Sequence, residues 1–127
     1  MIKMIVQNWR RSDLTHEQFV ARWRGKHAQL VTQCAKAMGM VRYVQSEKIA
    51  SPELEKFARS RGWAEPADSL TEVWWESKEA MEVAMGSPQG QAASALLQAD
   101  EQEFCDSKKL SAFLSVEHVI FDFTVQK

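Results

Sequence analysis

A histidine on the apolar face of a predicted helix is the residue whose position most suggests chemistry. Its apolar neighbours recur at spacings of three and four residues, which is typical of a helix packed on a larger core. They are Phe19, Trp23, Leu30, Val31 and Cys34. The imidazole of His27 lies inside this stripe, where it needs a hydrogen-bond partner or acts as an acid or base. Spacing alone leaves both readings open, and a satisfied core histidine is the commoner case.

Composition bounds the class of protein. The chain has 127 residues, enough for one domain with a real core, and a formal net charge of -1. No basic excess argues for nucleic acid, and no apolar stretch is long enough for a membrane span or a secretory signal. Cys34 and Cys105 stand singly, without a C-x-x-C motif, which fits a reducing, cytoplasmic location and free thiols.

The periodicity predicts the order strand, helix, strand, strand, helix, strand in one domain, residues 1–127. The expected strands are 2–9, 40–47, 69–76 and 113–125. The expected main helices are 15–37, opened by a capping box of Thr15 and Gln18, and a second one in two pieces, 78–85 and 89–99. A short helix, 53–60, is expected in the connection between the second and third strands. This order is the ferredoxin-like βαββαβ arrangement, an α+β fold whose helices cover one face of a four-stranded antiparallel sheet.

The second face of the sheet is expected to be mixed in character. Alternation assigns to it aromatic, apolar and charged side chains together. They are Tyr43, Gln45, Glu72, Trp74, His118, Ile120 and Asp122. Such a patch marks an interface or a ligand cavity. Two copies packed sheet against sheet would cover it and enclose a lumen, so a homodimer is expected.

Four segments carry a resemblance to the EthD family of the dimeric α+β barrel superfamily. They are F-V-A-R-W-R-G-K-H, R-Y-V-Q, L-T-E-V-W-W-E-S with the later S-P-Q-G, and D-E-Q-E-F-C-D. One departure is Gln29 after Ala28, where the family often has proline. The resemblance implies a cofactor-independent fold with a pocket between helices and sheet, and relatives that include lactone isomerases and polyketide dehydratases, cyclases and oxygenases.

The resemblance also implies roles for individual residues. His27 takes the catalytic position as a general base, and Tyr43 becomes a donor to a developing oxyanion. The remaining candidates for substrate binding are Trp9, Gln45, Glu72, Trp74 and His118. Plain readings stand beside these: a space-filling tyrosine, an interface histidine at His118, and Glu72 paired with an arginine. His118 and Asp122 are about 13 Å apart along a strand and form no dyad.

Two functions from different classes follow. The first is a cofactor-free isomerase or lyase that dehydrates, cyclises or isomerises a small lactone or aromatic polyketide-like compound by proton transfer, as in aromatic catabolism. The second is a non-catalytic binding or accessory protein of an oxygenase or degradation system. No metal site is expected, because the histidines show no ligand spacing. A haem-degrading relative ranks lower, since only His27 and His118 could be axial ligands.

Overall fold

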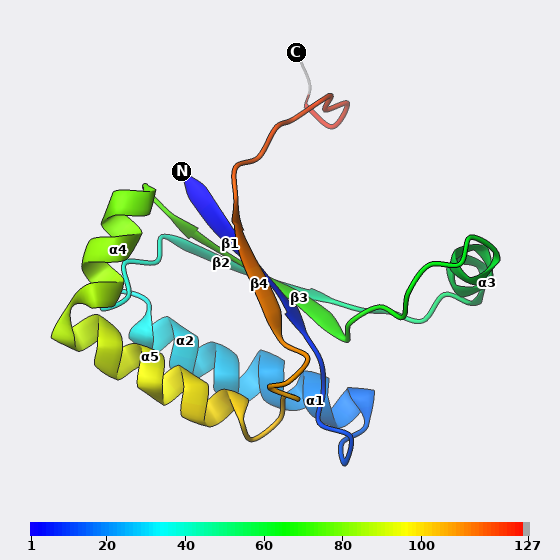
Figure 1. Cartoon of the computed structure of the whole chain (residues 1–127), viewed down its shortest axis with the longest axis horizontal. Coiled ribbons are helices and arrows are strands. Elements are labelled where there is room, and N and C mark those ends of the chain that lie inside the picture. The colour runs from blue at the N-terminus through cyan, green and yellow to red at the C-terminus, as the bar shows by residue number, and fades with distance from the viewer. Residues whose placement is uncertain (126–127) are drawn as a thin grey trace.

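A four-stranded antiparallel sheet forms the centre of the protein. In the computed structural model, which describes residues 1–125, the strands are β1 (Ile2–Asn8), β2 (Arg42–Glu47), β3 (Ser69–Trp75) and β4 (Ser111–Ser115). Their order in the sheet is β2-β3-β1-β4, and every neighbouring pair is antiparallel. Figure 1 shows most of the helices gathered on one side of this sheet, with one helix standing apart from them. The predicted ferredoxin-like α+β fold is therefore confirmed.

The first helical segment carries an irregularity at its centre. It consists of α1 (His16–Arg22), a π-helical turn η1 (Trp23–His27) and α2 (Ala28–Cys34). The predicted capping box is present, with Thr15 accepting from the Gln18 amide while the Gln18 side chain accepts from the Thr15 amide. Helical structure ends at Cys34, earlier than the predicted residue 37. The chain then turns through Gly39, whose φ of 74° favours glycine.

Two further helices complete the layer over the sheet. They are α4 (Lys78–Gly86) and α5 (Pro88–Glu101), each begun by a serine that accepts a backbone hydrogen bond. The core between helices and sheet forms two apolar clusters. One contains Phe19, Trp23, Phe104 and Cys105, and the other Val31, Cys34, Met38, Ala93 and Leu97. Both cysteines are buried free thiols.

The strand register decides which side chains meet the helices. Tyr43 lies opposite Val73, and Gln45 lies opposite Thr71, so these four side chains share the helix-covered face. The prediction that placed Tyr43 and Gln45 beside Glu72 and Trp74 is wrong. A nearly continuous apolar strand pattern does not say which face is which, and pairing fixes the choice. The opposite face of the sheet, away from the helix layer, is called the open face here. It carries Glu72 and Trp74 of β3 together with Lys3, Arg42 and Val44 of the neighbouring strands.

The predicted last strand is wrong over most of its length. Only Ser111–Ser115 pairs with β1, because the ladder ends where β1 begins at Ile2, near the N-terminus of the chain. Residues 116–125 leave the sheet and project from the domain (Figure 1). His118, Ile120 and Asp122 are exposed there and do not lie on a sheet face. A separate helix, α3 (Pro52–Ser60), also projects and has no buried residue.

Candidate active site

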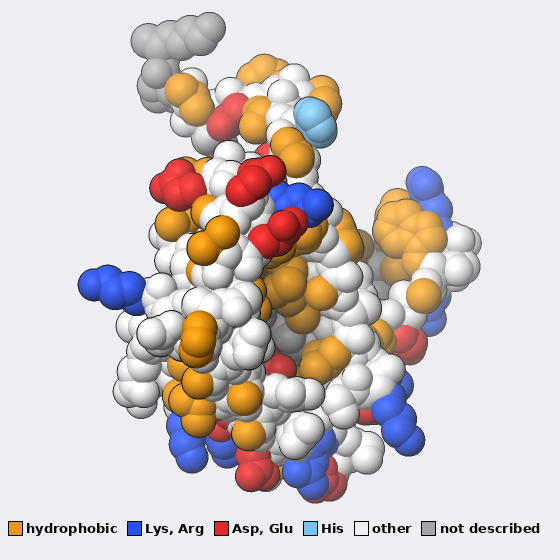
Figure 2. All heavy atoms as spheres, turned by 60° about the vertical axis from the view of Figure 1, so that its left-hand side comes forward, with side chains coloured by type: hydrophobic (Ala, Val, Ile, Leu, Met, Phe, Trp, Pro, Cys, Tyr) orange, Lys and Arg blue, Asp and Glu red, His pale blue; other side chains and the backbone are white. Residues whose placement is uncertain are grey.

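A cavity of about 440 Å³ lies between the helix layer and the sheet. Its volume is within the range of small-molecule sites. Its walls are mainly aliphatic side chains and methionines: Met4, Val6, Val31, Met38, Met40, Val73, Met85 and Leu97. Seven polar residues complete the lining: Asn8, His27, Tyr43, Thr71, Ser94, Gln98 and Glu101. Figure 2 shows a hollow with hydrophobic side chains near the centre of the face that α4 and α5 bring forward.

His27 reaches this cavity from the end of the π-helical turn. Its Nδ1 lies 2.8 Å from Oδ2 of Asp100, while Oδ1 of the same carboxylate accepts a hydrogen bond from Arg22. The ring of Phe104 packs edge-on against the imidazole at 5.0 Å between centroids. No described residue bonds to Nε2, so this nitrogen is the one left for a ligand. π-Helical turns often occur at functional sites, where they re-aim one side chain.

The electrostatics of this pair define the state of the imidazole. Burial lowers the pKa of His27 below the ordinary 6.5, and the hydrogen bond to Asp100 only partly opposes this shift. Burial by itself would raise the pKa of Asp100, but the hydrogen bonds from Arg22 and His27 outweigh it and lower the net value. Asp100 is thus ionised and accepts a hydrogen bond from the Nδ1–H group of a neutral His27. Nε2 keeps its lone pair, as a general base requires.

Tyr43 lines the same cavity from the sheet. Its hydroxyl accepts a hydrogen bond from Nε2 of Gln45 at 3.3 Å, and Gln45 is itself anchored on the carbonyl of Trp23 at 2.9 Å. Burial is the main reason that the pKa of Tyr43 is raised, so the hydroxyl keeps its proton at neutral pH. A neutral, half-buried phenol is a hydrogen-bond donor suited to a carbonyl oxygen that gains negative charge.

Glu101 adds a second titratable group to the cavity. Burial, and then the neighbouring charge of Asp100, raises the pKa of Glu101 above the ordinary 4.5. Within residues 1–125 its carboxyl group makes no side-chain hydrogen bond or ion pair. Both effects favour the protonated acid. The cavity therefore holds a proton acceptor at His27 and, at Glu101, a carboxyl group whose pKa its surroundings raise.

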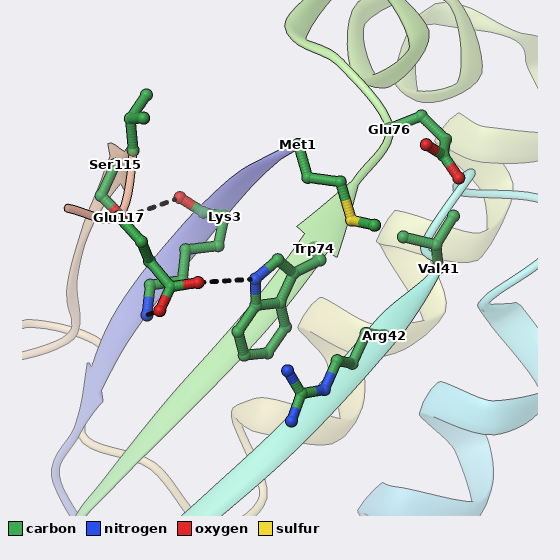
Figure 3. Close-up of a pocket in the computed structure, with 9 residues that line it drawn as sticks. Met1, Lys3, Val41, Arg42, Trp74, Glu76, Ser115 and Glu117 are labelled. Carbon is green, nitrogen blue, oxygen red and sulfur yellow. Dashed lines mark hydrogen bonds and ion pairs between the residues drawn. The ribbon is translucent and has the colours of Figure 1, made fainter. Parts of the chain in front are cut away.

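The other predicted binding residues lie elsewhere. Trp9 stacks under the ammonium of Lys109 and does not line the cavity, and His118 is exposed after β4. Glu72 pairs with Lys3 on the open face of the sheet. Figure 3 shows Trp74 on that face, with Arg42 on one side of the indole and Glu117 accepting from its Nε1. Of the predicted residues, the structure thus brings together His27, Tyr43 and, behind them, Gln45.

Asp100 and Glu101 are the residues that the sequence reasoning did not assign to the site. The signal was available, because a histidine inside an apolar stripe requires a polar partner. An acidic run begins at Asp100, directly after the predicted helix 89–99, and its carboxylates could supply that partner. Spacing along one helix cannot show that Asp100 contacts His27, which lies 73 residues earlier in the chain.

Metal and thiol chemistry find little support in these side chains. No group of three His, Cys, Asp or Glu side chains gathers as a metal site would need, over residues 1–125. Burial, above all, raises the pKa of Cys105 to about 12, so this thiol is not a nucleophile at neutral pH. No helix within the described part of the chain has the length and apolar character to cross a membrane.

Comparisons with known proteins agree on the fold. An EthD family protein from Bacillus halodurans is 19% identical with a TM-score of 0.62, covering 93% of this chain and 99% of its own. A dimeric ferredoxin-like protein of unknown function from Bacteroides fragilis is 10% identical (TM-score 0.55, 90% and 93% covered). SnoaB, a cofactor-independent oxygenase from Streptomyces nogalater, is 11% identical (TM-score 0.52, 95% and 97% covered). No curated protein gives a match.

The sequence comparison covers the site as well as the fold. A family profile described as the EthD domain matches residues 11–108, which include the π-helical turn, β2, β3 and the whole of α5. Every polar group of the His27, Tyr43 and Glu101 arrangement lies inside this match. The chain belongs to the EthD family.

Proposed function

We propose that this protein is a cofactor-independent enzyme that moves a proton next to a carbonyl group of a small, uncharged compound. Isomerisation, dehydration and cyclisation of a lactone or an aromatic polyketide-like compound belong to this class. The observation that carries the proposal is the neutral His27, held through Nδ1 by an ionised Asp100, with Nε2 free in an apolar cavity that Tyr43 shares. A base so oriented accepts a proton from carbon at Nε2, and the carboxylate of Asp100 stabilises the imidazolium that forms.

Three side chains carry out the proposed proton transfers. Nε2 of His27 takes a proton from the carbon next to the carbonyl, and the resulting enolate oxygen accepts the hydrogen bond of Tyr43. Glu101, as the acid, gives its proton to a departing hydroxyl group in a dehydration or to a second carbon in an isomerisation. The imidazolium then returns a proton to the Glu101 carboxylate through water. Dehydration releases one water, and isomerisation leaves the composition unchanged.

The walls of the cavity limit the substrate class. Among residues 1–125 no lysine or arginine lines the cavity, so a carboxylate or phosphate would enter without a counter-charge from this part of the chain. Four of the walls are methionines, which adapt to irregular apolar shapes. No tryptophan lines the cavity, so a flat ligand would contact aliphatic side chains and the ring of Tyr43. These features favour a neutral, mostly apolar ketone or lactone.

A non-catalytic binding protein is the second candidate. The largely apolar lining is the feature that favours it, since such walls hold a hydrophobic molecule without any chemistry. A carrier needs neither the free Nε2 of His27 nor an acid at Glu101. The two candidates therefore differ in what happens to the protons of a bound ligand.

We further propose a homodimer formed by packing the open faces of two sheets. The open face carries apolar side chains of all four strands around the Lys3–Glu72 ion pair: Ile5, Val44, Leu70, Trp74 and Phe113. Phe113 is 57% exposed in the single chain. An aromatic residue exposed on a sheet face is typical of an interface. The ferredoxin-like protein from Bacteroides fragilis is described as dimeric, which supports the proposal.

Proton exchange tests the enzymatic proposal before the reaction is known. A panel of neutral lactones and aromatic hydroxyketones is incubated with the protein in D₂O, and mass spectrometry measures deuterium uptake next to the carbonyl. We expect uptake with the natural protein, loss of at least about 100-fold with His27→Asn, and no change with the exposed neighbour variant Lys26→Gln. A ligand that binds but exchanges no proton would overturn catalysis in favour of a carrier.

A further inference from the structure

The side chain of Gln45 joins the helical segment that carries His27 to the strand that carries Tyr43. Its Nε2 donates to the backbone carbonyl of Trp23 at 2.9 Å and to the hydroxyl oxygen of Tyr43 at 3.3 Å. Trp23 begins the π-helical turn that ends at His27. One amide group therefore contacts both halves of the candidate site, although Gln45 is not one of the described residues that line the cavity.

Hydrogen-bond chemistry fixes the direction of these two contacts. A backbone carbonyl oxygen can only accept, so the Gln45 amide must turn its NH₂ group, and not its oxygen, toward Trp23. The second hydrogen of the same NH₂ group then points at Tyr43. Because an amide NH₂ group only donates, the oxygen of Tyr43 is the acceptor in this bond. The phenolic proton of Tyr43 is therefore left for another partner.

A second hydroxyl group beside Tyr43 has a similar arrangement. Thr71 lies opposite Gln45 in the register of β2 and β3, and its Oγ1 accepts from Nδ2 of the buried Asn8 at 2.9 Å. Burial raises the pKa of Tyr43, and hydrogen bonding by Gln45 and by Thr71 opposes this rise because both side chains favour the phenolate. Both neighbours thus act as donors toward the Tyr43 oxygen, and neither takes its proton.

The cavity is what remains for the phenolic proton. Among residues 1–125 no group accepts a hydrogen bond from the Tyr43 hydroxyl, and Tyr43 lines the cavity together with His27. A ligand carbonyl oxygen is an acceptor, and it becomes a stronger one as negative charge develops on it. A donor that already points at this oxygen needs no reorganisation during the reaction, which is how a preorganised site stabilises developing charge.

We propose that Gln45 is a positioning residue that directs the phenolic proton of Tyr43 into the cavity and fixes its place relative to Nε2 of His27. The bond to Trp23 supplies the second part of this role, because that carbonyl belongs to the same turn as His27. The arrangement favours ligands whose carbonyl oxygen meets Tyr43 while the neighbouring carbon faces His27. This inference rests on the proposed enzymatic function and adds a residue that acts through Tyr43 without touching the ligand.

Two substitutions separate the direction of this bond from the space that Gln45 fills. Gln45→Met keeps the length of the side chain and removes both donors, so the Tyr43 hydroxyl becomes free to rotate. Gln45→Glu keeps the shape and reverses the polarity. The introduced carboxyl group can bond the Trp23 carbonyl only through its own proton, and its other oxygen then accepts from Tyr43. Gln33→Glu makes the same exchange on the exposed side of α2 and serves as the matched control.

Raman spectroscopy tests the direction of the bond without a substrate. Tyr43 is the only tyrosine of the chain, so the tyrosine Fermi doublet reports this hydroxyl alone. The relative intensity of its two bands distinguishes a phenol whose oxygen accepts a hydrogen bond from one whose hydroxyl donates. We expect acceptor character to be highest in the natural protein, lower in Gln45→Met and lowest in Gln45→Glu. Donor character in the natural protein, or a doublet that Gln45→Glu leaves unchanged, would overturn the proposal.

Deuterium exchange with a ligand found in the screen measures the consequence for turnover. We expect kcat to fall about tenfold in Gln45→Met and about 100-fold in Gln45→Glu, with KM changed by less than about threefold, because the donor acts on developing charge. Gln33→Glu should keep the natural rate. Equal losses in Gln45→Met and Gln45→Glu would show that only the filled space matters and would overturn the directional role.

A double variant tests whether Gln45 acts through Tyr43. In a Tyr43→Phe background, Gln45→Glu should cost no further activity, since the positioned proton is already absent. A further loss as large as in the natural background overturns the positioning role. If the natural protein exchanges no ligand proton while the doublet shows an accepting Tyr43, the enzymatic proposal fails and the direction of the hydroxyl is supported. Exchange combined with a donating Tyr43 overturns the positioning role and leaves the enzymatic proposal standing.

Discussion

The hydrogen bond of 2.8 Å between Nδ1 of His27 and Oδ2 of Asp100 joins the π-helical turn to the last turn of α5. Asp100 is 8% exposed and also accepts a hydrogen bond from Arg22, so one carboxylate holds both the guanidinium and the neutral imidazole. This geometry gives the imidazole a defined tautomer and leaves Nε2 to the cavity. The proposed chemistry depends on this one contact between two helices.

The Asp100→Asn variant tests the role of the Asp100 charge while the shape of the site is kept. The amide keeps the volume but can no longer stabilise an imidazolium, so we expect exchange activity to fall at least about 100-fold. The free energy of unfolding should fall by about 1–3 kcal/mol, because Arg22 and His27 lose a charged acceptor. Urea unfolding measures the change in stability, and deuterium uptake next to the carbonyl of the ligand measures the change in exchange activity. The exposed neighbour variant Glu103→Gln should change neither, and full activity in Asp100→Asn would contradict the assigned role.

The pH dependence of stability should show the lowered pKa of His27. Between that lowered value and 6.5, the unfolded chain binds more protons at this residue than the folded protein. The free energy of unfolding should therefore rise with pH through this window, and the stability contributed by the neutral imidazole should be lost as the pH falls. Urea titrations at several pH values measure this slope. His27→Asn should flatten it, and an unchanged slope in the variant would count against the buried, neutral state.

Glu101→Gln should make the fold more stable and the enzyme slower. Because burial and Asp100 raise the pKa of Glu101, the folded chain keeps this proton in the pH range between 4.5 and the raised value, where the unfolded chain has released it, so the free energy of unfolding falls as the pH rises through that range. Glutamine removes that cost but cannot donate an acidic proton. We expect a higher melting temperature at pH 7, reduced turnover and a missing alkaline limb in the pH–rate profile, since that limb reports loss of the proton from the acid. A variant that keeps the natural pH profile would show that Glu101 transfers no proton.

Filling the cavity should abolish ligand binding without unfolding the protein. Ser94 lines the cavity from α5, whereas its neighbour Ala95 is exposed on the same helix. Ser94→Leu places a larger side chain in the binding space, and Ala95→Leu adds the same side chain outside it. Calorimetric titration with a ligand found in the exchange screen should show at least about tenfold weaker binding for the first variant only. Equal affinity in both would place the ligand elsewhere.

Gly25→Ala should stabilise the π-helical turn. A Cβ at Gly25 would meet nothing within 4 Å, and its φ is not in the left-handed region. Alanine restricts the unfolded chain more than glycine does, so we expect a gain of about 0.5–1 kcal/mol in the free energy of unfolding. Chemical denaturation measures it. A loss of stability would mean that the turn needs the freedom of glycine to present His27.

Much of the fold was predictable because local signals and the global fold agree. The capping box of Thr15 and Gln18 and the serines before α3, α4 and α5 begin helices where the sequence indicates. The apolar stripe through Phe19 and Trp23 correctly placed His27 against the core. These signals act over a few residues, so a single chain reveals them.

The incorrect or missing predictions concern features that depend on contacts between residues far apart in the sequence. Trp74 and Trp75 are adjacent and both apolar, but only Trp75 faces the helices, and its indole donates to the carbonyl of Met38. The face of Tyr43 follows from its register with Val73, which alternation alone does not give. The alternation after β4 predicted a strand that the single chain does not form. Asp100 escaped notice because its contact with His27 closes through the tertiary fold.

The protonation state of His27 tests the central claim most directly, and it needs no substrate. Nitrogen NMR of the imidazole in the ligand-free protein distinguishes a protonated from an unprotonated ring nitrogen. At pH 7 we expect a proton on Nδ1, none on Nε2, and titration only below the ordinary 6.5. A proton on Nε2 at pH 7, or an imidazolium that persists above 6.5, would contradict a base poised in the cavity.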